Sequence, residues 1–166
     1  MNNRNIVITG FMGTGKSTIG PLVAGMLKRP FIETDTEIER RAGLSIPQIF
    51  EQQGEVAFRQ MERALCEELS IQQGLVISTG GGTLIDDVNR TLMLKSSFVV
   101  CLNASLAILE RRLSASFNRP LASEWRQRLE QREAIYRTLP HQVDTSNLSP
   151  HEIAQEIIHL WRKASQ

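Results

Sequence analysis

The chain has 166 residues, enough for one domain with a sizeable core, and its charged content of 22% is ordinary for a globular protein. A formal net charge of +1 gives no electrostatic reason to expect nucleic acid or an anionic membrane surface as a partner. No apolar stretch approaches the roughly 20 residues that span a bilayer, and the N-terminus lacks the pattern of a signal peptide. We therefore expect one domain over residues 1–166, monomeric and cytoplasmic, with Cys66 and Cys101 as reduced core thiols.

The hydrophobic pattern predicts strands that alternate with helices along the whole chain. Strands are expected where short apolar runs end in glycine or polar residues, at 5–9, 30–32, 75–78, 97–102 and 142–145. Helices are expected over 16–27, 36–43, 45–54, 55–73, 86–95, 104–114, 124–137 and 150–162. Pro21 lies inside the first of these helices and predicts a kink or an irregular first turn. Continuously apolar strands between helices indicate an α/β fold, a parallel sheet covered by helices on both faces.

A phosphate-binding loop is predicted directly after the first strand. The segment from Gly10 to Ser17, GFMGTGKS, matches GxxxxGK[ST] and lies between an expected strand and an expected helix. In such a loop the backbone amides point at phosphate oxygens, and the helix N-terminus adds its positive dipole end. Lys16 would reach the β- and γ-phosphates, and the Ser17 hydroxyl is placed to bind Mg²⁺. The motif predicts a nucleoside triphosphate site, made of Gly13, Thr14, Gly15, Lys16, Ser17 and Thr18.

A cluster of carboxylates follows the second expected strand. Asp35 lies three positions after this strand, and ligands of an open parallel sheet bind outside the carboxyl ends of its strands. A carboxylate there can orient or deprotonate an attacking hydroxyl, or hold a metal through water. Glu37 and Glu39 lie further into the expected helix, where negative charge near the N-terminus is favourable by itself. We therefore take Asp35 as the working carboxylate.

Three consecutive glycines follow the third expected strand. Gly80, Gly81 and Gly82 come directly after Thr79. Glycine has no side chain, so this turn gives a ligand direct access to the backbone. Its place at the carboxyl end of a strand favours a binding role over a plain flexible turn.

Arginines predict the charge of the acceptor. Arg132 shares the apolar stripe of its expected helix with Leu129 and Tyr136, where a purely solvated arginine is not expected. Arg59 is three positions before Glu62, which can hold its guanidinium in place. Two inward arginines suit a carboxylate or a phosphate, although a structural ion pair explains either arginine alone equally well.

A polar segment at 115–123 predicts a surface loop between two helices. It contains Arg119 and Pro120, and with the adjoining helix ends it predicts a mobile lid over about residues 112–125. A closing lid would bring Arg119 onto the transferring phosphate, where its charge would stabilise the transition state.

Taken together, these motifs resemble the shikimate kinase family over about residues 5–160. GFMGTGKST, FIETD, FRQME at 58–62, STGGGTL at 78–84, NRPLA at 118–122 and REAIY at 132–136 occur in the family's order. The resemblance implies an enzyme that uses ATP and Mg²⁺ to phosphorylate the 3-hydroxyl of shikimate, giving shikimate 3-phosphate and ADP on the way to chorismate and the aromatic amino acids. It also implies a three-layer α/β/α P-loop kinase fold, with a five-stranded parallel sheet in the order 2-3-1-4-5 and a lid.

The resemblance further implies roles for individual residues. In the acceptor region, about residues 33–62, Asp35 would contact the shikimate hydroxyls and act as base or orienter for the 3-hydroxyl. Arg59 and Arg132 would bind the shikimate carboxylate, and the triple glycine would touch the substrate through the backbone of Gly81. On the nucleotide side, Arg112 would pack on adenine and Arg119 would contact the phosphates. Mg²⁺ would be bound by Ser17 and, through water, by Glu33 and Asp35.

Two positions and the length of one segment depart from the family's pattern. The family usually has aspartate where this chain has Glu33, and often has arginine where this chain has Leu148. The stretch between the NRPLA lid motif and Arg132 is also shorter than in the family. Two alternatives follow: another small-molecule kinase of the same fold, for gluconate or a nucleoside monophosphate, and a nucleotide-binding homologue with impaired catalysis.

Overall fold

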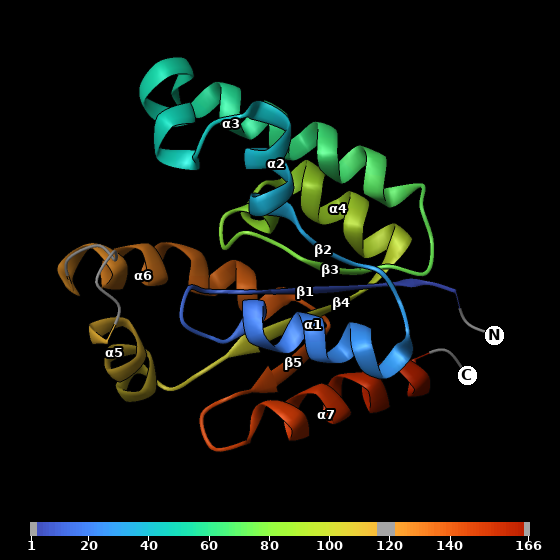
Figure 1. The fold of residues 1–166 in the computed structure, drawn as a ribbon. Coiled ribbons are helices and arrows are strands. Elements are labelled where there is room, and N and C mark those ends of the chain that lie inside the picture. The colour runs from blue at the N-terminus through green and yellow to red at the C-terminus, as the bar shows by residue number, and fades with distance from the viewer. Residues whose placement is uncertain (1–2, 116–121, 165–166) are drawn as a thin grey trace.

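The computed structural model describes residues 3–115 and 122–164, and Figure 1 shows their arrangement. In chain order the elements are β1 (Asn5–Gly10), α1 (Lys16–Leu27), β2 (Phe31–Glu33), α2 (Thr34–Ala42), α3 (Ile46–Ser70), β3 (Val76–Ser78), the 3₁₀ helix η1 (Thr83–Ile85), α4 (Asp87–Ser96), β4 (Ser97–Asn103), α5 (Leu106–Ser114), α6 (Ala122–Thr138), β5 (His141–Asp144) and α7 (Pro150–Lys163). The predicted alternation of strands and helices is confirmed. Within this part of the chain, no helix is long and apolar enough to cross a membrane.

Within the described residues, five strands form one parallel sheet in the order β2-β3-β1-β4-β5. The sheet order implied by the family resemblance is therefore confirmed. Central strand β1 pairs with β3 and with β4, so that Ile6 lies between Val76 and Phe98. All six residues of β1 are buried, because helices cover both faces of the sheet.

Alternating residues of the strands divide the core between the two faces of the sheet. Ile6 and Ile8 pack on the face covered by α1 and α7, in a cluster that includes Val23. Val7 packs on the opposite face, in a cluster to which α3, α4, α5 and α6 contribute. Figure 1 shows α1 and α7 on one side of the sheet and α2, α3 and α4 on the other. The three-layer α/β/α architecture is confirmed.

The helix expected at 45–54 and the one expected at 55–73 form a single element, α3. A kink lies at their predicted boundary, because Gly54 has the non-helical angles φ 83° and ψ 168°. The helix ends at Ser70, three residues before its predicted end, and the chain then turns towards β3. Asn5 stabilises this turn, since its Nδ2 donates to the carbonyl oxygens of Leu69 and Gln72 at 3.1 and 2.9 Å.

Helix α1 runs from Lys16 to Leu27 and tolerates Pro21. Pro21 is exposed. The expectation for the cysteines is confirmed, because Cys66 and Cys101 are free and buried.

Two glycines of α1 predict opposite effects of the same substitution. A Cβ at Gly20 would lie 2.9 Å from Cζ of the Phe31 ring, whereas a Cβ at Gly25 meets nothing within 4 Å. Gly20→Ala is expected to lower the free energy of unfolding by about 1–3 kcal/mol through overpacking. Gly25→Ala is expected to raise it by about 0.5–1 kcal/mol, because alanine loses less backbone entropy in a helix. Urea denaturation of both variants tests this, and a shift of the same sign in both would contradict the packing of α1 on β2.

Candidate active site

The loop between β1 and α1 has the conformation that phosphate binding requires. Gly13 and Gly15 adopt the left-handed φ values of 81° and 103°, which glycine tolerates without strain. Lys16 folds back over the loop, and its Nζ donates to the carbonyl oxygens of Gly10 and Phe11 at 2.7 and 3.0 Å. Its ammonium group therefore lies beside the exposed N-terminus of α1, where a phosphate would bind.

A cavity of about 400 Å³ joins this loop to the carboxyl ends of β2 and β3. It brings together most of the predicted site residues, and its lining is Met12, Gly13, Gly15, Lys16, Ser17, Thr18, Glu33, Asp35, Thr79, Gly80, Gly81 and Arg132. Thr14 does not line it. The Thr14 hydroxyl is buried and donates to Phe11 O at 2.7 Å, so this side chain shapes the loop instead.

Ser17 and Glu33 form a direct contact at one end of the cavity. The Ser17 hydroxyl donates to Glu33 Oε1 at 2.7 Å, and the Thr36 hydroxyl donates to Oε2 at 2.9 Å. Within 3–115 and 122–164, no three His, Cys, Asp or Glu side chains cluster closely enough to hold a metal by themselves. An oxygen-only set with few protein ligands suits Mg²⁺, because this ion usually keeps several waters.

Asp35 lies in the first turn of α2, which begins two residues earlier than predicted. Burial raises its pKa to about 6, the negative charge of Glu62 adds to the rise, and Lys16 opposes it. Asp35 Oδ1 is buried without a hydrogen-bond partner in the structure. A buried carboxylate oxygen that faces a cavity and has no partner is the group expected to receive a ligand hydroxyl.

Arg59 is held at the end of the glycine turn by a buried carboxylate. Its Nη1 lies 2.5 Å from Oε2 of Glu62, which is only 2% exposed. The predicted contact between these two side chains is thus confirmed. The other Glu62 oxygen accepts from the Thr83 hydroxyl at 2.7 Å. Sequence reasoning missed Thr83, although its place directly after the triple glycine was a usable signal.

The three glycines pass between Asp35 and the two arginines in order along the chain. A Cβ at Gly80 would lie 2.5 Å from Asp35 Oδ1. At Gly81 it would lie 3.2 Å from Arg132 Nη1, and at Gly82 2.9 Å from Arg59 Nη1. Side chains in this turn would therefore displace the charged groups around it. The turn accordingly has a carboxylate at one end and two guanidinium groups at the other.

Arg112 lies on the nucleotide side of the loop. Its Nη1 donates to Gly13 O and to the Thr145 hydroxyl, both at 3.0 Å, and its Nη2 donates to Thr145 O at 2.8 Å. Arg112 therefore ties the phosphate loop to the segment after β5. The other predicted nucleotide-side arginine, Arg119, lies outside the described residues.

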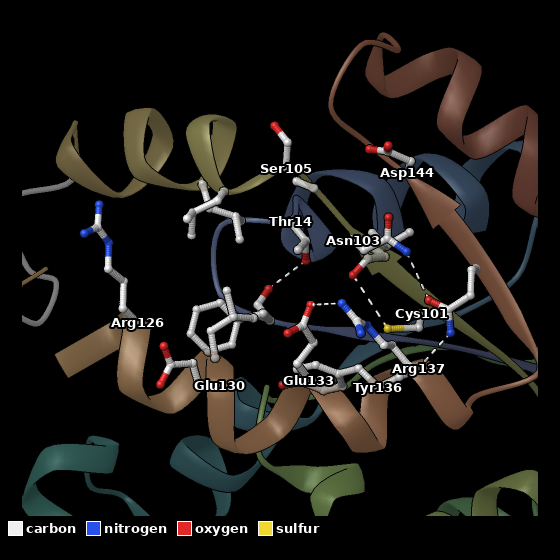
Figure 2. A pocket seen from close by; sticks show the side chains of 17 residues that line it. Thr14, Cys101, Asn103, Ser105, Arg126, Glu130, Glu133, Tyr136, Arg137 and Asp144 are labelled. Carbon is white, nitrogen blue, oxygen red and sulfur yellow. Dashed lines mark hydrogen bonds and ion pairs between the residues drawn. The ribbon is translucent and has the colours of Figure 1, made fainter. Parts of the chain in front are cut away.

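A second cavity, of about 570 Å³, lies between α5, α6 and the carboxyl ends of β4 and β5. Figure 2 shows it with Thr14 and Tyr136 on its walls. Its charged side chains include the ion pair of Glu133 with Arg137, and Arg126, which pairs with Glu110 outside the cavity. None of the predicted acceptor residues line it. Although it is larger, we place the chemistry in the first cavity, which holds Lys16, Asp35 and Arg132.

Fold and site together define a P-loop phosphotransferase with a small acceptor cleft beside the phosphate loop. The sequence profile described as "Shikimate kinase" matches residues 12–162. The chain belongs to the shikimate kinase family, and the resemblance of its motifs to that family is confirmed. Members of this family are kinases that use ATP.

Individual relatives agree with this assignment. The chain is 39% identical to the shikimate kinase of Pelotomaculum thermopropionicum, over 96% of each chain. A solved structure of the shikimate kinase of Acinetobacter baumannii in complex with shikimate matches with a TM-score of 0.89 and 34% identity, covering 98% of this chain and 94% of that one. A gluconokinase from Sinorhizobium meliloti matches with a TM-score of 0.63 and 18% identity, covering 98% of this chain and 96% of that one. This last likeness shows a common fold alone.

The raised pKa of Asp35 predicts a stability that depends on pH. The folded state binds the Asp35 proton more tightly than the unfolded chain, whose pKa is near the ordinary value of 3.8. The stabilisation from this proton is full below about pH 4 and is lost as pH rises to about 6, the pKa in the folded state. Asp35→Asn is therefore expected to unfold at higher urea concentration than the wild type at pH 8, with a smaller difference at pH 5. Both are measured without nucleotide or metal.

Glu37→Gln is a control for this measurement, because the pKa of Glu37 is shifted in the opposite direction to that of Asp35. Hydrogen bonds from Arg40 and Arg41 lower the pKa of Glu37 to about 2. Its stabilising effect is present above the ordinary pKa of 4.5 and is lost only as pH falls towards 2. Glu37→Gln is expected not to stabilise the protein at pH 8. An Asp35→Asn effect that is equal at both pH values would contradict the burial of an ionised Asp35.

Proposed function

We propose that this protein transfers the γ-phosphoryl group of ATP to the 3-hydroxyl of shikimate, giving shikimate 3-phosphate and ADP. The order of charged groups along the glycine turn carries the proposal. Asp35 lies at Gly80 and the two arginines lie at Gly81 and Gly82. Three consecutive residues span at most about 7 Å between their outer Cα atoms. This distance suits a ring with a hydroxyl at one side and a carboxylate at the other.

Each end of the acceptor has a matching group, either in the cavity, as Asp35 and Arg132 are, or beside the adjoining Gly82, as Arg59 is. The guanidinium groups of Arg59 and Arg132 present planar donors to a carboxylate, which they can bind bidentately. Asp35 Oδ1 accepts a hydrogen bond from the hydroxyl at the other end. Because the guanidinium of Arg59 donates a hydrogen bond to Glu62, it is oriented before the substrate binds.

The proposed transfer is a single in-line step. The hydroxyl oxygen attacks the γ-phosphorus, the bond from the γ-phosphorus to the bridging oxygen breaks, and the hydroxyl proton passes to Asp35. With a pKa of about 6, Asp35 is mostly ionised at neutral pH and is a stronger base than an ordinary aspartate. Lys16 and the loop amides stabilise the charge that develops on the phosphate oxygens.

Mg²⁺ would neutralise charge between the β- and γ-phosphates when bound. The Ser17 hydroxyl would bind it directly, with Glu33 and Asp35 acting through water. A role for Glu33 in holding Mg²⁺ through water is consistent with its position, because its longer side chain still reaches the Ser17 hydroxyl at 2.7 Å.

We also propose the remaining nucleotide contacts, the oligomeric state and the cellular location of the enzyme. Arg112 would pack on adenine, and a lid at about 112–125 would bring Arg119 onto the phosphates. The protein would be one domain over 1–166 that acts as a cytoplasmic monomer. The net charge of +1 gives no reason to add a nucleic acid or membrane partner.

Two rivals make different predictions. A gluconate or nucleoside monophosphate kinase shares the fold but phosphorylates a different acceptor. A nucleotide-binding homologue without catalysis would not need Asp35 in the cavity beside Lys16. An assay of ADP release separates all three, with shikimate, gluconate or a nucleoside monophosphate as the acceptor. We expect release that depends on shikimate, and ATP binding without it would overturn the proposal.

The role of Asp35 is tested in the same assay. Asp35→Asn keeps the size of the side chain but removes its ability to accept a proton. We expect kcat to fall at least about a hundredfold, the usual scale for loss of a general base. A near-normal kcat in a folded variant would rule out Asp35 as base or orienter.

Arg132→Lys tests the carboxylate contact. Lysine keeps the positive charge but loses the planar pair of donors that grips a carboxylate. We expect the KM for shikimate to rise, with little change in the KM for ATP. Arg128→Lys, on the exposed side of α6, is the matched control and should leave both constants unchanged. An unchanged KM for shikimate in Arg132→Lys would contradict the assignment.

A further inference from the structure

Tyr136 connects two parts of the acceptor site that lie far apart in the sequence. It lies on α6 one turn after Arg132, and its side chain is only 6% exposed. Its hydroxyl donates to the carbonyl oxygen of Gly81 at 2.5 Å. The Arg132 guanidinium lies beside the same glycine, since a Cβ at Gly81 would lie 3.2 Å from Arg132 Nη1 and 3.5 Å from the Tyr136 hydroxyl oxygen. The Tyr136 hydroxyl therefore lies next to the guanidinium of α6 while it is bonded to the backbone of the glycine turn.

The tyrosine stays a hydrogen-bond donor at any physiological pH. Burial raises its pKa to about 12, against the opposing effect of Arg132. Its side chain lines the cavity between α5 and α6, as Figure 2 shows, and belongs to the buried core cluster on this face of the sheet. The ring is therefore packed in place while the hydroxyl reaches the glycine turn.

A run of three glycines needs such an anchor. Glycine loses more conformational freedom on ordering than any other residue, so the hydrogen bonds of the turn decide which way its peptides face. Gly80 N donates to the Thr34 hydroxyl at 3.1 Å, and the carbonyl oxygens of Gly80 and Gly82 accept from backbone N–H groups of the following 3₁₀ turn at 3.2 and 3.1 Å. The carbonyl oxygen of Gly81, in the middle of the turn, accepts from the Tyr136 side chain. Because a trans peptide is planar, fixing Gly81 O also fixes the opposite direction of the Gly82 N–H.

We propose that Tyr136 is a positioning residue that holds Arg132 and the Gly81 peptide in one preorganised site for the acceptor carboxylate. The proposal rests on the function proposed above and adds a residue to it. Tyr136 acts through Arg132 and the backbone, without touching the substrate. Its hydroxyl should therefore affect acceptor binding and leave nucleotide binding unchanged.

Tyr136→Phe tests the proposal because it removes the hydroxyl and keeps the buried ring. We expect the KM and the Kd for shikimate to rise about 2- to 12-fold, the range for one net hydrogen bond. The KM for ATP should stay within the error of the assay. Thr138→Val is the matched control: it removes a hydroxyl from the same helix that also donates to a carbonyl, Ile135 O at 2.6 Å, and should change neither constant.

The methyl ester of shikimate separates positioning from a general structural role. It keeps the hydroxyls but lacks the carboxylate charge, so the penalty of Tyr136→Phe should largely disappear with this acceptor. An equal penalty with acid and ester would overturn the proposal, as would an unchanged shikimate Kd in folded Tyr136→Phe. If the wild type does not phosphorylate shikimate at all, the proposed function fails instead.

A spectroscopic test needs no variant. Tyr136 is the single tyrosine of the chain, so growth on 3-fluorotyrosine labels this position alone. Its ¹⁹F resonance should shift on addition of shikimate, saturate with the Kd measured for binding, and respond far less to the methyl ester. A resonance that does not move at saturating shikimate would contradict the proposal.

Discussion

The parallel direction of the central strands is the constraint on which the site depends. β1 pairs with β3 and with β4, and β3 pairs with β2, so the carboxyl ends of these strands meet at one edge of the sheet. The phosphate loop, Asp35 and the glycine turn follow β1, β2 and β3 directly. Gly10 ends β1 with a φ of 139°, where a Cβ would collide with the carbonyl oxygen of Leu102. Residues that are remote in sequence thus line one cavity, although the segments that follow the three strands are short.

One buried carboxylate connects recognition of the acceptor with its activation. Glu62 holds Arg59 on one side and accepts from Thr83 on the other. Its negative charge also adds to the rise in the pKa of Asp35. The group that orients a carboxylate-binding arginine therefore also strengthens the proposed base. Through Glu62, the arginine proposed to bind the acceptor and the carboxylate proposed to activate it are coupled within one small site.

Sequence reasoning succeeded where chemistry is encoded locally. The phosphate loop, the strands and the contact between Arg59 and Glu62 depend on residues within a few positions of one another, and all are confirmed. It could not predict contacts that tertiary packing creates, such as the bond from the Thr14 hydroxyl to Phe11 O, the bond from Tyr136 to Gly81 O, or the cavity that Tyr136 lines. The family is confirmed by the comparisons, whereas the roles of individual residues remain predictions. Arg119 belongs to the part of the chain that the structure does not describe.

The central claim is that the acceptor lies along the glycine turn with its carboxylate at the arginines and one hydroxyl at Asp35. This orientation determines which hydroxyl receives the phosphoryl group. Phosphorus–proton correlation NMR of the product formed from ATP and shikimate measures it directly. We expect coupling of the phosphorus to the proton on carbon 3 alone. Phosphate on the 4- or 5-hydroxyl would contradict it.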